Sequence, residues 1–360
     1  MVRIGFIGFG WRANGYVKAM EQRPDLFKIS GIYMRNEKKA QENRKKYPNL
    51  IDTKLEVFLN REMDFVLLAV PRDDALQYLR ILSDKKIPVL CETPPGANVK
   101  ELVECWKLKE EKGAKIQVAE QYFLQPYHGA CQSIIRQKLL GEVSNVSISM
   151  IHDYHAISMM RRYLNTGFET CFIRGRSFAF PVRGNCDRKG LYKDTGEDFF
   201  DTRKRADFVF ASGKVGFYDF SDEQYFNYYR SRHLRVQGNH GEIYDNEVVS
   251  LGEDGYPVIG KMIREDLGKE SNLEGFSLRR ITLNAKELYR SPFADQPFSR
   301  LMDDEIAMLS LLVKMKEYVE GGNEVYALEE GLQDTYLTYL MNEAIYKDKE
   351  IQAKQMPWSK

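Results

Sequence analysis

The sequence predicts an α/β protein of two domains, the first of which is built on a parallel, helix-covered sheet. Apolar stretches typical of buried strands alternate with helical segments over the first third of the chain. That alternation ends near residue 122, and a hairpin pattern typical of antiparallel sheet follows at 206–220. The chain has 360 residues, more than one ordinary domain needs. We therefore expect domains at residues 1–122 and 123–360.

The composition argues against several classes of protein. The formal net charge is +1, so no strong overall field would recruit nucleic acid or an anionic membrane. No apolar run approaches the ~20 residues of a membrane span, and the apolar N-terminal stretch is predicted to be a strand rather than a targeting signal. The five cysteines are odd in number and widely spaced, which favours a reduced, cytoplasmic protein without disulfides.

The N-terminal segment has the order strand, tight turn, helix. An apolar run, Val2–Ile7, precedes two glycines spaced one residue apart, and a helical period opens at Tyr16. In a dinucleotide-binding unit, the first glycine allows the turn and the second lets the backbone approach a pyrophosphate. Free N–H groups at the helix start then attract the anion. We predict cofactor contacts at Gly8, Phe9, Gly10, Trp11, Arg12 and Ala13; a plain strand-turn-helix corner is the alternative.

The remaining strands of the first domain place further residues at the cofactor. They are predicted at 27–34, 64–70, 88–91 and 115–119. Open parallel sheets bind ligands at the carboxyl ends of their strands, so Val70, Pro71 and Glu92 should face the cofactor. The second strand ends in Met34-Arg35, where NAD-binding proteins usually place an acid. A cation without that acid favours NADP over NAD, but Arg35 fits equally well as a residue that stacks on adenine or faces water.

The order of these motifs resembles the Gfo/Idh/MocA family, the group of glucose–fructose oxidoreductase and inositol dehydrogenase. The matching segments are Ile7–Gly10, Leu68–Pro71, Val89–Pro94, Pro126, Leu140–Val143 and the pattern between Asp304 and Ile351. The resemblance implies a Rossmann domain followed by an α/β domain with a large, mostly antiparallel sheet, which often forms an oligomer interface. It also implies NAD or NADP as cofactor, and a sugar, cyclitol or related polyol as substrate.

The resemblance also implies two catalytic positions. Relatives have a lysine in a Glu-Lys-Pro motif, whose cation assists proton removal from the reacting hydroxyl; here that position is Thr93. Threonine has no charge to stabilise an alkoxide, and such stabilisation is commonly worth ~10²–10³ in rate. His155 matches the histidine that opens a helix in the family, which makes it the candidate acid–base residue. A structural role for His155 at a helix start is the alternative.

The second domain supplies candidate substrate residues. A hairpin is predicted at 206–211 and 215–220, and a long loop over the site at 174–201. Tyrosine, arginine and glutamine side chains can stack on sugar rings and bind hydroxyls, although they also make ordinary sheet surfaces and dimer contacts. The candidates are Arg161, Arg162, Tyr218, Gln224, Tyr225, Arg230 and Arg232. The cluster 152–155 lacks the further ligands that a metal site needs, so no metal is predicted.

The C-terminal part is predicted to be helical. The acidic run 303–305 favours a helix start, and Gly321-Gly322 favours its end. A last helix is expected from about residue 329 to 346. The apolar residues of both helices are predicted to pack in the core.

The sequence thus predicts an NAD(P)-dependent oxidoreductase for a carbohydrate-like substrate, in a homo-oligomer assembled through the C-terminal sheet. Two alternatives stay open. The replacement at Thr93 is compatible with a nucleotide-binding regulatory protein that has lost turnover. Some relatives use tightly held NAD as a transient oxidant, so an NAD-assisted lyase or glycosidase is also compatible.

Overall fold

The computed structural model describes residues 1–184, 194, 196–294 and 299–359. Its packing divides the chain into two compact units. The first consists of Met1–Gly129, Arg264–Ile281 and Tyr289–Leu332, and the second of Ala130–Ile263, Thr282–Leu288 and Gln333–Lys360. Each unit is therefore assembled from segments that are distant in sequence. The division at residues 122 and 123 stays a prediction about where independently folding domains begin.

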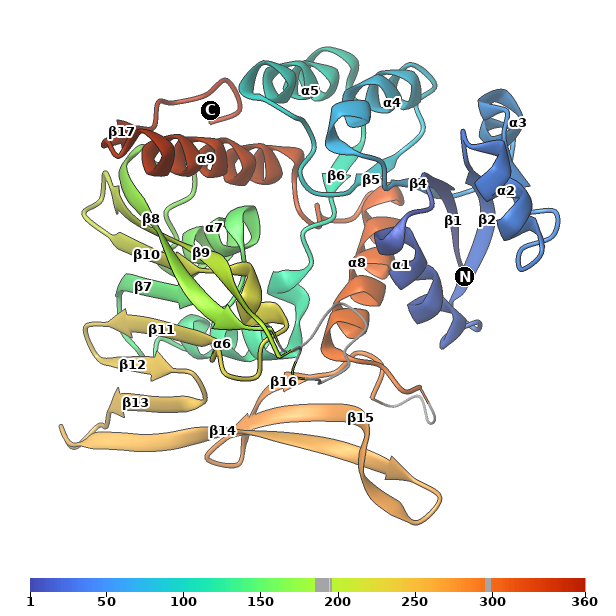
Figure 1. The fold of residues 1–360 in the computed structure, drawn as a ribbon. Coiled ribbons are helices and arrows are strands. Elements are labelled where there is room, and N and C mark those ends of the chain that lie inside the picture. The colour runs from blue at the N-terminus through green and yellow to red at the C-terminus, as the bar shows by residue number, and fades with distance from the viewer. Residues whose placement is uncertain (185–193, 195, 295–298, 360) are drawn as a thin grey trace. The chain divides into compact units, whose positions relative to one another are not determined.

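The first unit contains a parallel six-stranded sheet in the order β3-β2-β1-β4-β5-β6 (Figure 1). Its strands are β1 (Val2–Ile7), β2 (Phe27–Tyr33), β3 (Ile51–Asp52), β4 (Phe65–Leu68), β5 (Val89–Cys91) and β6 (Ile116–Val118). Its helices are α1 (Trp11–Glu21), α2 (Glu37–Arg44), α3 (Leu55–Leu59), α4 (Arg72–Asp84), α5 (Val99–Lys112) and α8 (Asp303–Val319), with the 3-10 helix η1 (Tyr122–Leu124). Every residue of β4, β5 and β6 is buried, as in sheets covered on both faces. The predicted Rossmann domain is confirmed.

The strand order reverses between β1 and β4, which is the point where open α/β sheets bind ligands. Gly8 ends β1 there with φ +85°, a conformation that side chains rarely adopt. A Cβ at Gly8 would lie 2.3 Å from the carbonyl oxygen of Ala69, which follows β4. Glycine is therefore required for the ends of β1 and β4 to approach each other.

Helix α8 is distant in sequence from the rest of the first unit, yet it packs against α1, β1 and β4. Lys316 of α8 and Arg3 of β1 contact the same carboxylate oxygen, Asp64 Oδ1, at 3.0 and 2.9 Å. Burial opposes the charge of Asp64, but the hydrogen bonds from Arg3 and Lys316 lower its pKa below the usual range. The predicted helix at 303–319 is confirmed, and Gly321 follows it with φ +100°.

The second unit contains most of an eleven-stranded sheet in the order β16-β15-β14-β13-β12-β11-β7-β10-β9-β8-β17. The strands are β7 (Val143–Ser149), β8 (Cys171–Arg183), β9 (Asp198–Phe210), β10 (Val215–Phe220), β11 (His233–Gly238), β12 (Gly241–Tyr244), β13 (Glu247–Leu251), β14 (Pro257–Lys269), β15 (Asn272–Leu283), β16 (Lys286–Arg290) and β17 (Ile351–Gln352). The helices are α6 (Pro126–Arg136), α7 (Asp153–Leu164), α9 (Leu328–Lys347) and the 3-10 helix η2 (Asp222–Tyr225). Most strand pairs of the described residues are antiparallel, whereas β7 and β10 are parallel. The predicted large, mostly antiparallel sheet is confirmed.

Helices α7 and α9 cover one face of this sheet. A Cβ at Gly216 would lie 2.1 Å from Met160 Sδ of α7, and a Cβ at Gly175 would lie 2.6 Å from Ile345 Cγ1 of α9. On the other side, the large apolar side chains that are 40 to 47% exposed include Phe172, Phe178, Val209 and Phe217. Cross-strand register places these four residues on one side of β8, β9 and β10, and we call this side the exposed face.

Two expectations for the second unit are corrected. Residues 174–201 were expected to form a loop, but β8 pairs with β9 from Cys171 opposite Phe210 to Arg183 opposite Asp198. The sequence pattern of this segment is misleading because charged and aromatic side chains line the exposed face of its strands. Residues 185–193 and 195 of the expected loop lie outside the described residues. Strands β13–β16 also lie where no strand is predicted. The predicted hairpin is confirmed, since β9 and β10 pair antiparallel.

The four described cysteines, Cys91, Cys105, Cys131 and Cys171, are buried and form no disulfide with one another. Burial raises the pKa of Cys105 and of Cys171 to about 12, so both thiols are protonated at neutral pH and are poor nucleophiles. Cys186 lies outside the described residues. Among the helices of the described part of the chain, none is both long and apolar enough to cross a bilayer.

Candidate functional site

The glycine turn after β1 leaves its backbone accessible. Gly10 is the N-cap residue of α1 and, having no side chain, makes no side-chain cap to the first N–H groups of the helix. Nothing lies within 4 Å of the position that a Cβ would take at Gly10. Ala13 is fully buried on the other side of the helix, whereas Trp11 is 71% exposed. The turn therefore packs tightly on the side of Ala13 and leaves its backbone accessible at Gly10, as a pyrophosphate site requires.

Three of the other predicted cofactor residues surround this turn. The ring of Phe9 makes edge-to-face contacts with the rings of Phe6 and Tyr47. Val70 follows β4, and its Cγ1 would be 2.9 Å from a Cβ at Gly8. Pro71 is the N-cap residue of α4. The carboxyl ends of β1 and β4 are thus adjacent, as the sequence predicts.

Arg12 forms an ion cluster with two carboxylates from different parts of the first unit. Its Nε lies 3.2 Å from Glu92 Oε1, and its Nη1 lies 3.1 Å from Asp304 Oδ2. Its guanidinium also lies 5.1 Å from the centre of the Tyr16 ring. Burial opposes the charge, but the attraction of Glu92 and Asp304 outweighs it and raises the pKa of Arg12 well above its usual value. Arg12 Nη2 is buried and has no hydrogen-bond partner among the described residues.

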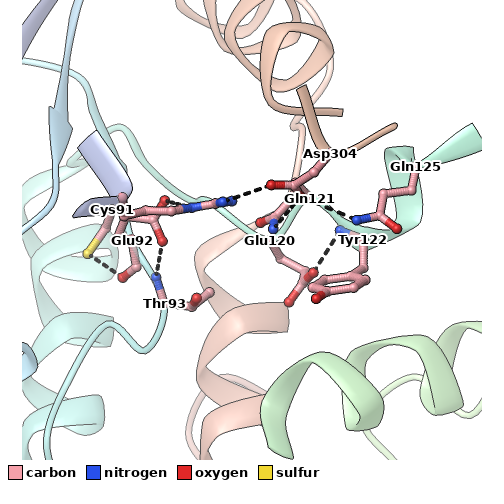
Figure 2. A network of polar contacts seen from close by, with 9 residues as sticks. Cys91, Glu92, Thr93, Glu120, Gln121, Tyr122, Gln125 and Asp304 are labelled. Atoms are coloured by element: carbon pink, nitrogen blue, oxygen red, sulfur yellow. Dashed lines mark hydrogen bonds and ion pairs between the residues drawn. The ribbon is translucent and has the colours of Figure 1, made fainter. Parts of the chain in front are cut away.

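Figure 2 shows how this network continues along the sheet edge. Glu92 follows β5, and its Oε2 accepts a hydrogen bond of 3.3 Å from the backbone N–H of Thr93. Asp304 Oδ1 accepts hydrogen bonds of 3.2 and 3.3 Å from the side-chain amides of Gln121 and Gln125, which follow β6. The turn that carries Thr93 is therefore held by a salt-bridged scaffold. The cation in contact with Glu92 is Arg12 rather than a lysine of the same turn.

Arg35 lies at the end of β2 and is paired with an acid from another element. Its Nη2 is 2.6 Å from Asp74 Oδ2, in the first turn of α4. The Arg35 side chain is 57% exposed and that of Asp74 is 25% exposed. Asp74 thus occupies the Arg35 guanidinium and would compete with an anionic ligand for it.

In the second unit, His155 lies in an aromatic cluster at the start of α7. It is 6% exposed, and its ring centre lies 4.5 Å from that of Tyr154 and 5.0 Å from that of His152. His152 Nδ1 lies 2.7 Å from the hydroxyl of Tyr225, which also accepts a hydrogen bond from the His152 N–H. Two imidazoles and two phenols are thus adjacent, and these groups can donate and accept protons.

Tyr218 and Gln224 are buried supports of this cluster. Tyr218 is 2% exposed; burial raises its pKa, and its hydroxyl donates to Asp153 Oδ1 at 3.4 Å. Gln224 is 2% exposed, and its amide donates to the carbonyl oxygens of Ser149 and Ser231, each at 2.9 Å. Tyr225, by contrast, contacts His152 directly. Of the three candidates, Tyr225 is the one placed beside the imidazoles.

The four arginine candidates lie in different surroundings. Arg161 is 3% exposed, and its Nη1 contacts Asp334 Oδ1 at 2.5 Å. Arg161 and Arg162 belong to the last turn of α7, six and seven residues after His155, which is about 9 to 10 Å along the helix. The Arg230 guanidinium lies 5.6 Å from the centre of the Phe180 ring. Arg232 is exposed at the surface. The structure does not bring these four side chains together.

Several residues of the two clusters were not expected from the sequence. Asp304 is predicted only as part of a helix start, and Asp74 is not singled out. Gln121 and Gln125 follow the last parallel strand, so the rule that ligands bind at the carboxyl ends could have found them. His152 is adjacent to the predicted His155, yet its pairing with Tyr225 depends on η2 folding back over β7.

Comparison with known proteins identifies the first unit. Residues 2–120 match the sequence model of the Gfo/Idh/MocA family, described as an oxidoreductase family with an NAD-binding Rossmann fold. No curated protein matches the chain in sequence. Solved structures match it over nearly its whole length, at sequence identities that show the fold alone.

Three of these structures illustrate the likeness. An oxidoreductase from Agrobacterium radiobacter, in complex with NAD⁺, L-tartaric acid and magnesium, is 13% identical, with a TM-score of 0.68 over 97% of this chain and 98% of that one. A levoglucosan dehydrogenase in complex with NADH is 14% identical, with a TM-score of 0.68 over 99% and 100%. A scyllo-inositol dehydrogenase from Lactobacillus casei is 11% identical, with a TM-score of 0.63 over 98% and 98%.

The order of motifs along the chain predicted a family, and both the fold and the match to the family's sequence model agree with that prediction. The glycine turn, the strand order and the sequence match all concern the same segment. The resemblance to the Gfo/Idh/MocA family is therefore confirmed: residues 2–120 match the model of that oxidoreductase family, which is described by its NAD-binding Rossmann fold, and the whole chain has the fold of solved oxidoreductases.

Proposed function

We propose that the protein is an NAD(P)-dependent oxidoreductase that acts on a sugar, cyclitol or related polyol. The observation that carries this proposal is the accessible glycine turn at the switch point of the parallel sheet. Gly10 has open space where a side chain would be, and α1 begins there without a side-chain cap. These features fit a dinucleotide pyrophosphate, which the N–H groups of the first turn would bind.

The substrate class is supported by relatives and by the cluster at the start of α7. A levoglucosan dehydrogenase and a scyllo-inositol dehydrogenase share the fold, and their substrates are polyhydroxylated rings. Tyr154, Tyr225 and His152 present aromatic surfaces and hydrogen-bonding groups of the kind that bind such rings. We retain Tyr225 as the leading substrate contact. Arg161 is engaged with Asp334, so we assign it no substrate contact.

The proposed reaction divides the work between cofactor and protein. A nicotinamide nucleotide held at the glycine turn by Gly8, Gly10 and the first turn of α1 would supply hydride transfer to or from the carbinol carbon of the substrate. His155 takes the hydroxyl proton, and the edge-on ring of His152 orients it. Thr93 supports the cofactor site through its turn, which Glu92 and Arg12 hold, but contributes no charge to the reacting oxygen. Without that charge, we expect slow turnover.

Thr93 also favours a second function, that of a nucleotide-binding regulatory protein. The salt-bridged scaffold around Glu92 preserves the turn whether or not chemistry occurs on it. Such a protein would bind a nicotinamide nucleotide and a polyol without net turnover. The experiments below separate the two functions.

We further propose that the protein prefers NADP and assembles through the exposed face. Arg35, which follows β2, would bind a 2′-phosphate, and its pairing with Asp74 would limit that preference. The exposed face carries four large apolar side chains beside a hollow of about 440 Å³, lined in part by Arg174, Arg205 and Asp207. Apolar patches rimmed by charges are typical of subunit interfaces.

The first prediction concerns the glycine turn. Gly10→Ala should keep the fold, because its φ of −85° and open space accept a Cβ, yet it should weaken NADH binding at least about tenfold by meeting the pyrophosphate. Gly8→Ala should instead lower the free energy of unfolding by at least roughly 1–3 kcal/mol, because the left-handed φ strains alanine and the new Cβ would also clash with Ala69 O. Nucleotide-induced rises in the melting midpoint and urea titrations measure both effects. Absence of any such rise with NAD(H) or NADP(H) in the wild type would refute the proposed function.

The second prediction concerns the choice of nucleotide. Arg35→Ala should weaken NADPH binding roughly tenfold or more, since a charge-assisted hydrogen bond contributes about 1.5–3 kcal/mol. NADH binding should change little. Asp74→Asn should strengthen NADPH binding, because it releases Arg35 from a competing carboxylate. Nucleotide fluorescence titrations measure these affinities. Equal NADPH affinity in the wild type and in Arg35→Ala would show that Arg35 faces solvent or adenine.

The third prediction concerns Thr93. With a panel of polyols and both nucleotides, Thr93→Lys should raise the rate of nucleotide reduction by about 10²-fold, because it restores a cation at the reacting oxygen. Thr93→Met has a similar length without the charge and should not. His155→Asn in the Thr93→Lys background should lose about 10²-fold, the contribution of an acid–base group.

The outcomes of this experiment also decide between the two functions. Turnover by the wild-type protein removes the regulatory function. Nucleotide binding without turnover in the wild type, together with a gain in Thr93→Lys, supports it. Equal rates in Thr93→Lys and Thr93→Met would contradict the assigned role of this position.

The fourth prediction concerns assembly. In sedimentation velocity, the wild-type protein should have at least twice the mass of one chain. Phe217→Glu should lower the measured mass toward that of one chain, because a charge on the exposed face disfavours burial of that face in an interface. Val57→Glu changes a residue of α3 that is 51% exposed and should leave the mass unchanged. A wild-type protein that sediments as one chain at micromolar concentration would exclude this interface.

A further inference from the structure

Three side chains of the second unit form a continuous hydrogen-bonded row that the proposed oxidoreductase function does not use. Ser231 Oγ lies 2.7 Å from His233 Nε2, and His233 Nδ1 lies 2.7 Å from Asp245 Oδ2. Ser231 precedes β11, His233 begins that strand, and Asp245 follows β12. A hydroxyl, an imidazole and a carboxylate in this order, at these distances, are the arrangement that activates a serine nucleophile.

Asp245 and Tyr244 orient the imidazole. Asp245 adopts φ +52°; its N–H donates to Leu234 O at 2.9 Å, and its Oδ1 accepts from Leu234 N at 2.9 Å. These two bonds direct the other oxygen, Oδ2, toward His233. The His233 ring also stacks on Tyr244, with centres 5.9 Å apart and planes 9° apart. A proton on Nδ1 shared with Asp245 leaves the lone pair of Nε2 directed at Ser231.

The backbone of Ser231 is anchored, while its side chain is accessible. Its carbonyl accepts a 2.9 Å hydrogen bond from the buried amide of Gln224. Ser231 itself is exposed, and the side chain of His233 is 43% exposed, so a small molecule can reach both. The next residue, Arg232, is exposed, and within the described part of the chain its guanidinium makes no hydrogen bond or ion pair. A cation beside the serine can meet negative charge that develops on a carbonyl oxygen.

We propose that Ser231, His233 and Asp245 form a second reactive site, at which Ser231 accepts the acyl group of small carboxylic esters. Ser231 Oγ forms a bond to the ester carbonyl carbon and gives its proton to His233 Nε2. The carbonyl–alkoxide bond then breaks, and the departing oxygen takes that proton to leave as an alcohol. Water attacks the acyl-serine, its proton passes through His233 back to Ser231, and a carboxylic acid is released.

The exposure of Ser231 and His233 sets the substrate class and the rate that we expect. Short, activated acyl esters are favoured, because they can react at an exposed serine without burial of a long chain. Arg232 is an exposed side chain rather than a rigid pair of backbone donors, so it is less preorganised than an oxyanion hole. We therefore expect acyl transfer that is slow but clearly faster than hydrolysis in buffer.

The test uses the whole chain and p-nitrophenyl acetate. The release of p-nitrophenol measures the rate of ester cleavage, and peptide mass spectrometry identifies the residue that carries the acetyl group. The wild type should hydrolyse the ester, and the acetyl group should be found on Ser231. Ser231→Ala should carry no acetyl group at this position, and its rate should fall at least about tenfold. Variants of catalytic triads usually lose more activity than that. Ser212→Ala removes another exposed serine, in the turn between β9 and β10, and should match the wild type.

Asp245→Asn separates catalysis from folding. Asparagine tolerates the left-handed φ of this position, so the turn should persist while the orientation of His233 is lost. We expect an unchanged melting midpoint with a rate at least about tenfold below that of the wild type. NADH binding should be the same in all three variants, which keeps this result independent of the oxidoreductase proposal. Equal rates in the wild type and Ser231→Ala, or acetyl groups on lysines alone, would show that the row is only structural.

Discussion

The first unit depends on how closely β1 and β4 approach at the switch point of its sheet. A Cβ at Gly8 would lie 2.3 Å from Ala69 O, so any other residue there would separate the two strand ends. The same turn brings Gly10 to the start of α1 with its backbone accessible. Close packing on one side and open N–H groups on the other are the two conditions for holding a pyrophosphate. One backbone constraint thus supports both the fold and the proposed cofactor site.

A network of charges maintains the shape of the neighbouring turn. Arg12 connects α1 to Glu92 after β5 and to Asp304 at the start of α8, and two glutamine amides complete the contacts of Asp304 (Figure 2). Removal of Arg12 would leave the largely buried Glu92 carboxylate without its cation, which would destabilise the turn. This scaffold can preserve the turn around Thr93 even though the family lysine is absent.

The second unit uses its sheet in two different ways. Its helix-covered face buries Tyr218 and supports the imidazoles at the start of α7, where protons can be exchanged. Its other face carries apolar side chains that suit a subunit interface. The row of Ser231, His233 and Asp245 arises from short-range register between β11 and β12, because His233 and Asp245 flank the paired residues of one hairpin. Proton transfer in the cluster and nucleophilic chemistry in the row would be separate activities.

The sequence by itself determined what depends on local periodicity: the glycine turn, the alternation of buried strands with helices, the helix at 303–319 and the hairpin of β9 and β10. It could not determine that Asp304 meets Arg12, that Asp74 meets Arg35, or that His152 meets Tyr225. Those contacts join residues that are far apart in sequence, and local propensity carries no information about such distances. It was misleading at 174–201, where strands with one exposed side have the composition of a loop. Only the tertiary structure decides which polar side chains share a site, because that depends on where whole strands and helices pack.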